Sequence, residues 1–138
     1  MAARGELRHT VGHVIDFVPT VLEIVGARPG NQWNGMTVPS LPGRSLLPAF
    51  ARDVVVPRDF LYFHHDHNRA LRVGDWKLVS KRPATNDYEL YDLRRDRSER
   101  VDLAGKEPAR VAAMALQWQS LESEYRKAAG GPSRETEK

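Results

Sequence analysis

The chain of 138 residues contains no cysteine, so it can form no disulfide, no thiolate metal site and no cysteine nucleophile. It also lacks an apolar run long enough to span a bilayer. Neither sign of charge dominates, because 21 Lys and Arg interleave with 18 Asp and Glu for a net charge of +3. We therefore expect neither a membrane nor a nucleic acid as a partner.

The 41% of hydrophobic residues is enough for a modest core in a chain of this length. Residues 1–10 carry charged side chains and no apolar stretch, so no signal peptide is visible in this sequence. The sequence leaves the localisation of the protein unknown.

Apolar residues recur at helical spacing between residues 14 and 26, which predicts a short helix with one apolar face. Asp16 is the expected N-cap, which places Pro19 in the first turn, where its missing N–H costs no intrahelical bond. Gly26 is expected to end the helix just past its last residue.

Residues 27–57 are rich in proline and glycine and predict a long, largely irregular surface loop, of which only residues 45–50 are apolar enough to dock. A connection of this length in a compact domain is typical of a segment held against a neighbouring surface. We therefore expect a partner surface that the chain does not itself contain.

Alternating apolar residues predict a four-stranded antiparallel meander. An amphipathic helix follows over residues 108–128, with Pro108 in its first turn and Gly130 after its end. The predicted fold is α+β, with the helix packed across the sheet and with the short capped helix and the long loop before it. The expected strands cover residues 60–65, 69–73, 76–81 and 88–93, with turns at residues 66–68, 74–75 and 83–87.

Three sequence motifs follow one another in a fixed order. Residues 13–20 read HVIDFVPT, residues 43–48 read GRSLLP, and residues 68–78 read NRALRVGDWKL, continued by ELYDL at residues 89–93. Together they resemble the C-terminal part of the arylsulfatase family, the type I sulfatases with an alkaline-phosphatase-like core, over residues 8–125.

The resemblance implies three parts. Residues 1–57 would be the end of the large sulfatase domain, residues 58–129 the C-terminal subdomain with sheet and helix, and residues 130–138 a disordered tail. The complete family enzyme cleaves a sulfate ester with calcium and with a formylglycine made from Cys or Ser in a Cys/Ser-x-Pro-x-Arg motif. Those groups belong to the missing large domain, so we expect no cofactor in this chain and no activity of the chain alone. Full-length relatives are often exported.

Residues 40–44, Ser-Leu-Pro-Gly-Arg, fit the Ser-x-Pro-x-Arg pattern. They could be a formylglycine precursor, or a loop that leads into the second motif. The pattern fixes only three positions. This copy comes after the first motif, whose residues 16–20 read Asp-x-x-Pro-Thr, whereas the formylglycine motif of the family comes before it. The sequence therefore favours a structural loop.

The cluster His64-His65-Asp66-His67 could be a metal site or a hairpin turn. In a strand His65 and His67 would share a face, but a turn at Asp66 breaks that pairing, and no spacing predicts a third ligand. We therefore expect turn or surface roles for His64 and His67. His67 stands where the family usually carries glycine, and histidine is among the residues that tolerate a positive φ.

The resemblance implies that His65, Asn68 and Arg69 contact the substrate, because the family's hairpin lies at the mouth of its cleft. Arginine offers a fork of donors to anionic oxygens, and His and Asn can bond hydroxyl groups. The alternative for Arg69 is an ion pair with an acidic neighbour on the sheet.

Two functions follow from the sequence. The first is a sulfatase subdomain that closes the active-site cleft and contributes substrate recognition. The second is a free-standing, non-catalytic module that binds an anionic glycan or a protein partner. The first predicts exposed apolar surface around Val14, Val18 and Leu46.

Overall fold

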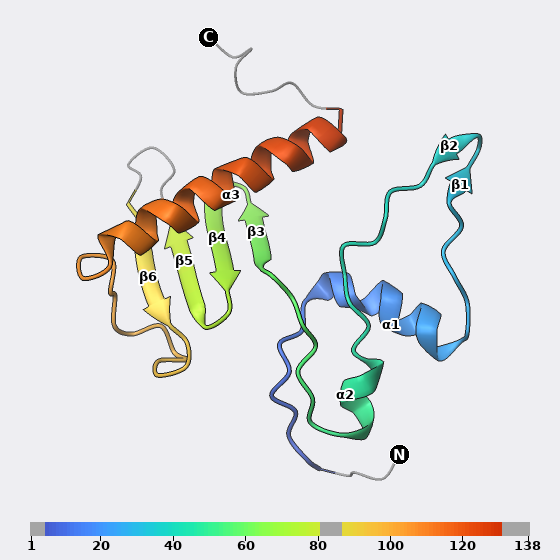
Figure 1. Cartoon of the computed structure of the whole chain (residues 1–138), viewed down its shortest axis with the longest axis horizontal. Coiled ribbons are helices and arrows are strands. Elements are labelled where there is room, and N and C mark those ends of the chain that lie inside the picture. Colours follow the sequence, from blue (N-terminus) through green and yellow to red (C-terminus); the bar gives the residue numbers. More distant parts are fainter. Residues whose placement is uncertain (1–4, 81–86, 131–138) are drawn as a thin grey trace. The chain divides into compact units, whose positions relative to one another are not determined.

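The computed structural model describes residues 5–80 and 87–130. The chain divides into two compact units, Met1–Arg58 and Asp59–Lys138 (Figure 1). Within the described ranges, no helix is both long and apolar enough to cross a membrane.

The second unit contains the predicted meander. Strands β3 (Leu61–His65), β4 (Asn68–Val73), β5 (Trp76–Ser80) and β6 (Glu89–Asp92) form one antiparallel sheet in sequence order, and α3 (Pro108–Ala128) lies across one face of it (Figure 1). The predicted α+β fold is confirmed. The strands form where apolar and polar residues alternate in the sequence. Successive side chains of a strand point to opposite faces of the sheet, so this alternation places the apolar ones on one face.

The core of this unit lies between the sheet and α3. Leu71 and Leu90 are fully buried and Leu78 is 2% exposed, and all three pack with Met114 and Trp118 of the helix. Burial of each such side chain contributes about 1.5–3 kcal/mol, so this layer is the main source of stability of the unit.

The hairpin between β3 and β4 turns tightly. His65 pairs with Asn68, so only Asp66 and His67 form the turn. The positive φ of 52° falls on Asp66, whereas the family's glycine had suggested position 67. Aspartate tolerates this conformation because its short polar side chain costs little there.

Two other predicted turns have different outcomes. Gly74 takes a φ of 57° in the turn between β4 and β5, as the sequence suggested. The turn predicted at residues 83–87 falls almost entirely outside the described residues, as does the predicted tail after Gly130.

The first unit contains α1 (Phe17–Ile24), which is preceded by a 3-10 turn at Val14–Asp16. Gly26 ends the helix with a φ of 66°, as predicted. The backbone N–H of Ala27 donates to Leu22 O over 2.9 Å, which satisfies a carbonyl of the last helical turn.

Residues 27–57 are less irregular than predicted. They contain a small hairpin of β1 (Gln32–Trp33) and β2 (Met36–Thr37) and one short helix, α2 (Leu47–Ala51). The hairpin turns at Asn34-Gly35, where both residues have positive φ, 48° and 76°. Asn-Gly is the strongest short hairpin signal in a sequence, so this element was predictable and was missed.

Candidate functional site

The first two family motifs meet at the carboxylate of Asp16. This side chain is completely buried. Its Oδ1 accepts from the backbone N–H of Arg44 at 2.8 Å, and its Oδ2 accepts from His13 N and from Arg58 Nη2, each at 2.7 Å. Asp16 therefore joins its own segment to two others, which lie 28 and 42 residues further along the chain.

Burial opposes ionisation of Asp16, but its hydrogen bonds outweigh burial. The bond from Arg44 N, with those from Arg58 and His13, holds the pKa of Asp16 below its ordinary value. The N-cap prediction was half right, since Asp16 occupies that position of α1 but bonds no N–H of that helix. Its carboxylate instead completes a capping box with His13 around the 3-10 turn.

Two further residues, Thr20 and Gly43, hold the first two motifs together. Thr20 Oγ1 donates to Asp16 O at 2.6 Å and accepts from Leu46 N at 2.9 Å. Gly43 packs so closely on Ile15 that a Cβ there would collide with the Ile15 carbonyl. We call this set of contacts around Asp16 the Asp16 junction. Residues 40–44 thus have a structural explanation, because the backbone of Gly43 and Arg44 takes part in the junction.

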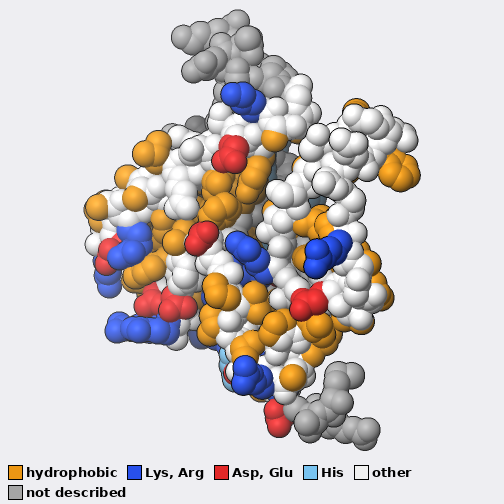
Figure 2. Space-filling model, turned by 45° about the vertical axis from the view of Figure 1, so that its right-hand side comes forward, with side chains coloured by type: hydrophobic (Ala, Val, Ile, Leu, Met, Phe, Trp, Pro, Cys, Tyr) orange, Lys and Arg blue, Asp and Glu red, His pale blue; other side chains and the backbone are white. Residues whose placement is uncertain are grey.

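The junction leaves one face of α1 open to solvent. Six apolar side chains of the 3-10 turn, α1 and its C-cap residue, at helical spacing, are 53–66% exposed. The expected exposure is found at two of the three named positions, while Leu46 is half-buried. Figure 2 shows hydrophobic side chains gathered on the surface of this unit. We call these six residues the α1 stripe: Val14, Phe17, Val18, Val21, Ile24 and Val25.

The three predicted substrate residues do not share one face of the sheet. His65 and Asn68 pair at the turn end of the hairpin and so lie side by side. Arg69 follows Asn68 in the same strand and therefore points to the opposite face, toward α3. The structure thus brings His65 and Asn68 together and sets Arg69 apart.

Arg69 is buried beneath the helix. It is 9% exposed, and its Cζ lies 5.0 Å from the centre of the Trp118 ring. Within residues 5–80 and 87–130, it has no ion pair with a carboxylate, so the alternative of a surface ion pair is not found there. Trp118 belongs to the apolar face of α3, and nothing in the helical spacing of that face pointed to Arg69.

His64 has a larger role than the surface position expected for it. Its ring meets the Trp118 ring edge-on, with centroids 5.3 Å apart. Its Nε2 lies 3.0 Å from Asp66 O, and its Nδ1 lies 3.8 Å from Oε1 of the buried Glu122. Arg126 Nε lies 3.2 Å from the same oxygen. His64 therefore links the hairpin to α3.

Tyr62 also packs against Trp118, beside His64. Its ring stacks on Trp118 with centroids 5.2 Å apart and meets Tyr125 edge-on at 5.2 Å. Burial, together with the Glu122 carboxylate, raises the pKa of Tyr62 to about 12. The phenol is therefore a neutral hydrogen-bonding group at physiological pH.

The described residues offer no metal site. They contain no group of three or more His, Cys, Asp or Glu side chains that could hold a metal ion, the histidine cluster included. These residues therefore do not fit the calcium of the family enzyme.

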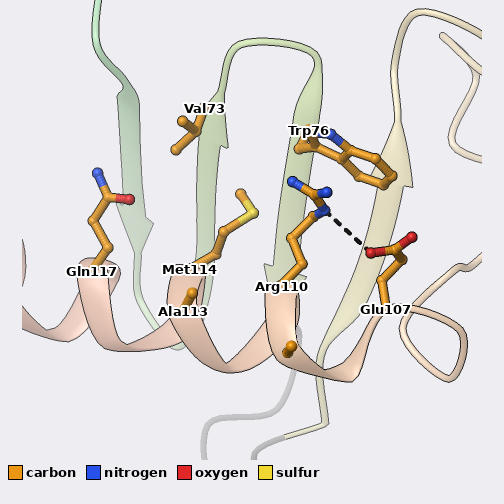
Figure 3. Close-up of a pocket in the computed structure, with 8 residues that line it drawn as sticks. Val73, Trp76, Glu107, Arg110, Ala113, Met114 and Gln117 are labelled. Carbon is orange, nitrogen blue, oxygen red and sulfur yellow. Dashed lines mark ion pairs between the residues drawn. The ribbon is translucent and has the colours of Figure 1, made fainter.

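A pocket of about 410 Å³ lies between the sheet and the first turns of α3 (Figure 3). Its charged groups are already engaged, because Arg110 Cζ lies 4.1 Å from the centre of the Trp76 ring and its Nε lies 3.5 Å from Glu107 Oε2. Val73 and Met114 provide apolar walls. We interpret this arrangement as the attachment of the start of α3 to β5.

Comparison with known proteins agrees with the three motifs. The chain is 30% identical over 116 residues to an uncharacterized sulfatase of Schizosaccharomyces pombe, covering 80% of this chain and 21% of that protein. No protein-family model matches the chain.

Solved structures show the same fold. A protein in complex with its substrate D-glucosamine-2-N,6-O-disulfate matches with a TM-score of 0.57 and 22% identity, covering 81% of this chain and 24% of that one. The protein Ps i-CgsB in complex with k-i-k-neocarrahexaose matches with a TM-score of 0.55 and 21% identity, covering 77% and 23%. At these identities the structural matches establish the fold alone.

The fold, a four-stranded sheet with a terminal helix, and the three motifs make the chain similar to sulfatases. The resemblance to the arylsulfatase family is confirmed, and the chain is similar to one part of such a protein. It spans about a fifth of the curated relative and about a quarter of the solved chains, as expected for a C-terminal part.

Proposed function

We propose that this chain is the C-terminal part of a sulfatase, which packs against the rest of the large sulfatase domain through the α1 stripe and contributes substrate recognition through the β3–β4 hairpin. The observation that carries the proposal is the α1 stripe, six apolar side chains along the 3-10 turn, α1 and its C-cap residue that are more than half exposed. Contiguous exposed apolar surface of this kind marks an interaction site.

Both ends of α1 are held in place before any partner binds. The Asp16 junction fixes its start through three hydrogen bonds, and Gly26 ends it with a defined cap. A surface held rigidly before binding loses less conformational entropy on association. The longer relatives supply the natural occupant, since this chain covers only 21–24% of them. We infer that the rest of a sulfatase fold covers the α1 stripe.

The hairpin supports a role in recognition. His65 and Asn68 lie together beside its turn, and the His65 side chain is 87% exposed. Imidazole and amide groups can bond the hydroxyls of a sugar, and Arg69 can bond an anionic oxygen. Two proteins of this fold are solved with D-glucosamine-2-N,6-O-disulfate and with k-i-k-neocarrahexaose. We therefore propose a sulfated sugar as the substrate class of the complete enzyme.

In that enzyme, the larger domain would hold the formylglycine and the calcium, which supply the nucleophile and the charge compensation for sulfate ester hydrolysis. The residues of this chain would close the cleft and orient the sugar. The chain alone is therefore proposed to be inactive.

The docking role is tested with the purified chain and an apolar-surface dye. We expect bright dye fluorescence and concentration-dependent association, and we expect the double variant Phe17→Gln/Val21→Gln to lose most of both. The matched control is Leu116→Gln, which removes an equally exposed but isolated apolar side chain of α3. A wild-type chain that stays monomeric and binds no dye contradicts docking through the α1 stripe.

The alternative function is a free-standing module that binds an anionic glycan. One observation favours it, namely that the buried residues of the core cluster and the half-buried side chains packed against them all belong to the second unit. It predicts that the chain alone, with its α1 stripe replaced by polar residues, still binds a sulfated oligosaccharide and not the desulfated one.

A further inference from the structure

We infer that Trp118 is a positioning residue, which holds the guanidinium of Arg69 in place for an anionic oxygen of the ligand. The inference rests on the recognition role proposed above for Arg69. It adds a residue of α3 to a site that the sequence motifs place only on the hairpin.

Arg69 is a buried cation that lacks a counterion in the described part of the chain. It is only 9% exposed, yet no carboxylate lies within ion-pair distance of it there. Burial of an uncompensated charge is unfavourable, so such a group is normally matched by an anion or a polarisable partner. The face of the Trp118 ring, 5.0 Å from Arg69 Cζ, supplies part of this compensation. An anion from outside the chain would supply the rest.

The Trp118 ring cannot easily turn away from Arg69. It is 1% exposed, and its Nε1 donates to Phe63 O at 3.1 Å. The Tyr62 ring stacks on it at 5.2 Å and an interplanar angle of 21°. A fully packed side chain with one hydrogen bond and one stacking partner has a single rotamer, so its ring face is a fixed platform.

This platform leaves the donors of Arg69 available. A guanidinium that lies over an aromatic face keeps its N–H groups for a carboxylate or a sulfate. Phe63 and Arg69 belong to adjacent strands, so the bond from Trp118 to Phe63 O sets the position of the ring relative to β4 as well. The geometry therefore couples the orientation of Arg69 to α3.

The experiment measures binding of inorganic sulfate to the full chain by NMR, following the side-chain Nε–Hε signal of Arg69. Arg69→Gln assigns the signal by removing it. Sulfate binding to this variant is measured by isothermal titration calorimetry, which does not depend on that signal, and is expected to be lost. In Trp118→Leu, which keeps the site filled but removes the ring, we expect the dissociation constant for sulfate to rise about threefold to tenfold.

The control uses a second tryptophan–arginine stack in the same unit. Trp76→Leu removes the ring beside Arg110, where the centroid distance is 4.1 Å, and should leave sulfate binding at Arg69 unchanged. Trp118→Phe keeps a ring and the core packing, and should bind sulfate more tightly than Trp118→Leu. If Trp118→Leu fails to fold, Trp118→Phe still tests whether the ring at position 118 affects sulfate binding at Arg69.

The outcomes separate the inference from the proposed function. If wild-type chain does not bind sulfate, or Arg69→Gln binds it as well as wild type, the recognition role of Arg69 is wrong and the inference falls with it. If Arg69→Gln loses binding while both Trp118 variants bind sulfate like wild type, only the inference is wrong, and Trp118 is a core residue alone.

Discussion

Arg44 donates its backbone N–H to the carboxylate of Asp16 over 2.8 Å, across 28 residues of sequence. This one bond joins residues 13–20 to residues 43–48, which are the first two motifs by which the chain resembles sulfatases. Both motifs are thereby explained by folding, because their polar residues satisfy one another inside the first unit.

Replacement of Asp16 by Asn should destabilise the first unit by about 3 kcal/mol, because Arg58 loses its buried ion-pair partner. Hydrogen exchange of the Arg44 amide measures this directly and should become much faster. Asp53→Asn is the control, since that carboxylate pairs with His9 at the surface. Equal exchange in wild type and Asp16→Asn would show that the junction does not depend on the charge.

The same junction should weaken in acid. The folded pKa of Asp16 lies below its ordinary value of 3.8, so the unfolded chain binds the proton more tightly than the folded chain. Its stabilisation is therefore fully present above the unfolded pKa and is lost as the pH falls through the folded pKa. Unfolding free energy measured from about pH 6 to about pH 3 should fall at the acid end, and fall less in Asp16→Asn.

Gly43→Ala should destabilise the junction by about 3 kcal/mol or more, because the new methyl group meets the backbone of Ile15, which cannot move without breaking the 3-10 turn. Gly30→Ala is the matched control, since the nearest atom to its Cβ would be Gln32 O at 3.7 Å. Urea denaturation compares the two variants. Similar midpoints would mean that the close packing on Ile15 is absent in solution.

Trp118→Ala should lower the stability of the second unit by about 3 to 5 kcal/mol, since it empties the centre of the layer between sheet and helix. Leu116→Ala, on the exposed side of the same helix, should change stability by less than about 0.5 kcal/mol. Thermal melts distinguish the two, and a shift of only a degree or two for Trp118→Ala would contradict the packing.

In a complete sulfatase that includes this chain, Arg69→Ala should raise the Michaelis constant for the natural substrate more than it lowers kcat. The physical reason is that Arg69 would bind an anionic oxygen remote from the reacting bond, equally in the ground state and the transition state. Arg110→Ala removes a comparable stacked arginine and should leave both constants unchanged. An unchanged Michaelis constant for Arg69→Ala excludes the recognition role.

The sheet and α3 were predictable to within one or two residues because their signals are local. Alternation marks β3 to β6, and the three-and-four spacing marks α3. The same alternation already implied that Asn68 and Arg69 point to opposite faces, although the family resemblance groups them. The β1–β2 hairpin was missed for another reason, because its Asn34-Gly35 turn is flanked by strands of only two residues each.

The candidate site was less predictable because its contacts join distant segments. Trp118 lies on α3 while Arg69 and Phe63 lie on the hairpin, and no local pattern pairs them. His64 likewise gains a role only because α3 brings Glu122 to its ring. Spacing along the chain can predict which face a side chain occupies, but not which residue of another element meets it.

The sequence by itself determined the order of the elements, the α+β class and the three motifs of the sulfatase resemblance, since these depend on local periodicity and on residue identity. Tertiary structure alone decided that Asp16 is a junction, that Arg69 is a buried cation on Trp118, and that the α1 stripe is left uncovered. Hydrogen bonding, cation–π contact and burial all depend on distances in space, and those distances exist only after distant segments of the chain have packed together.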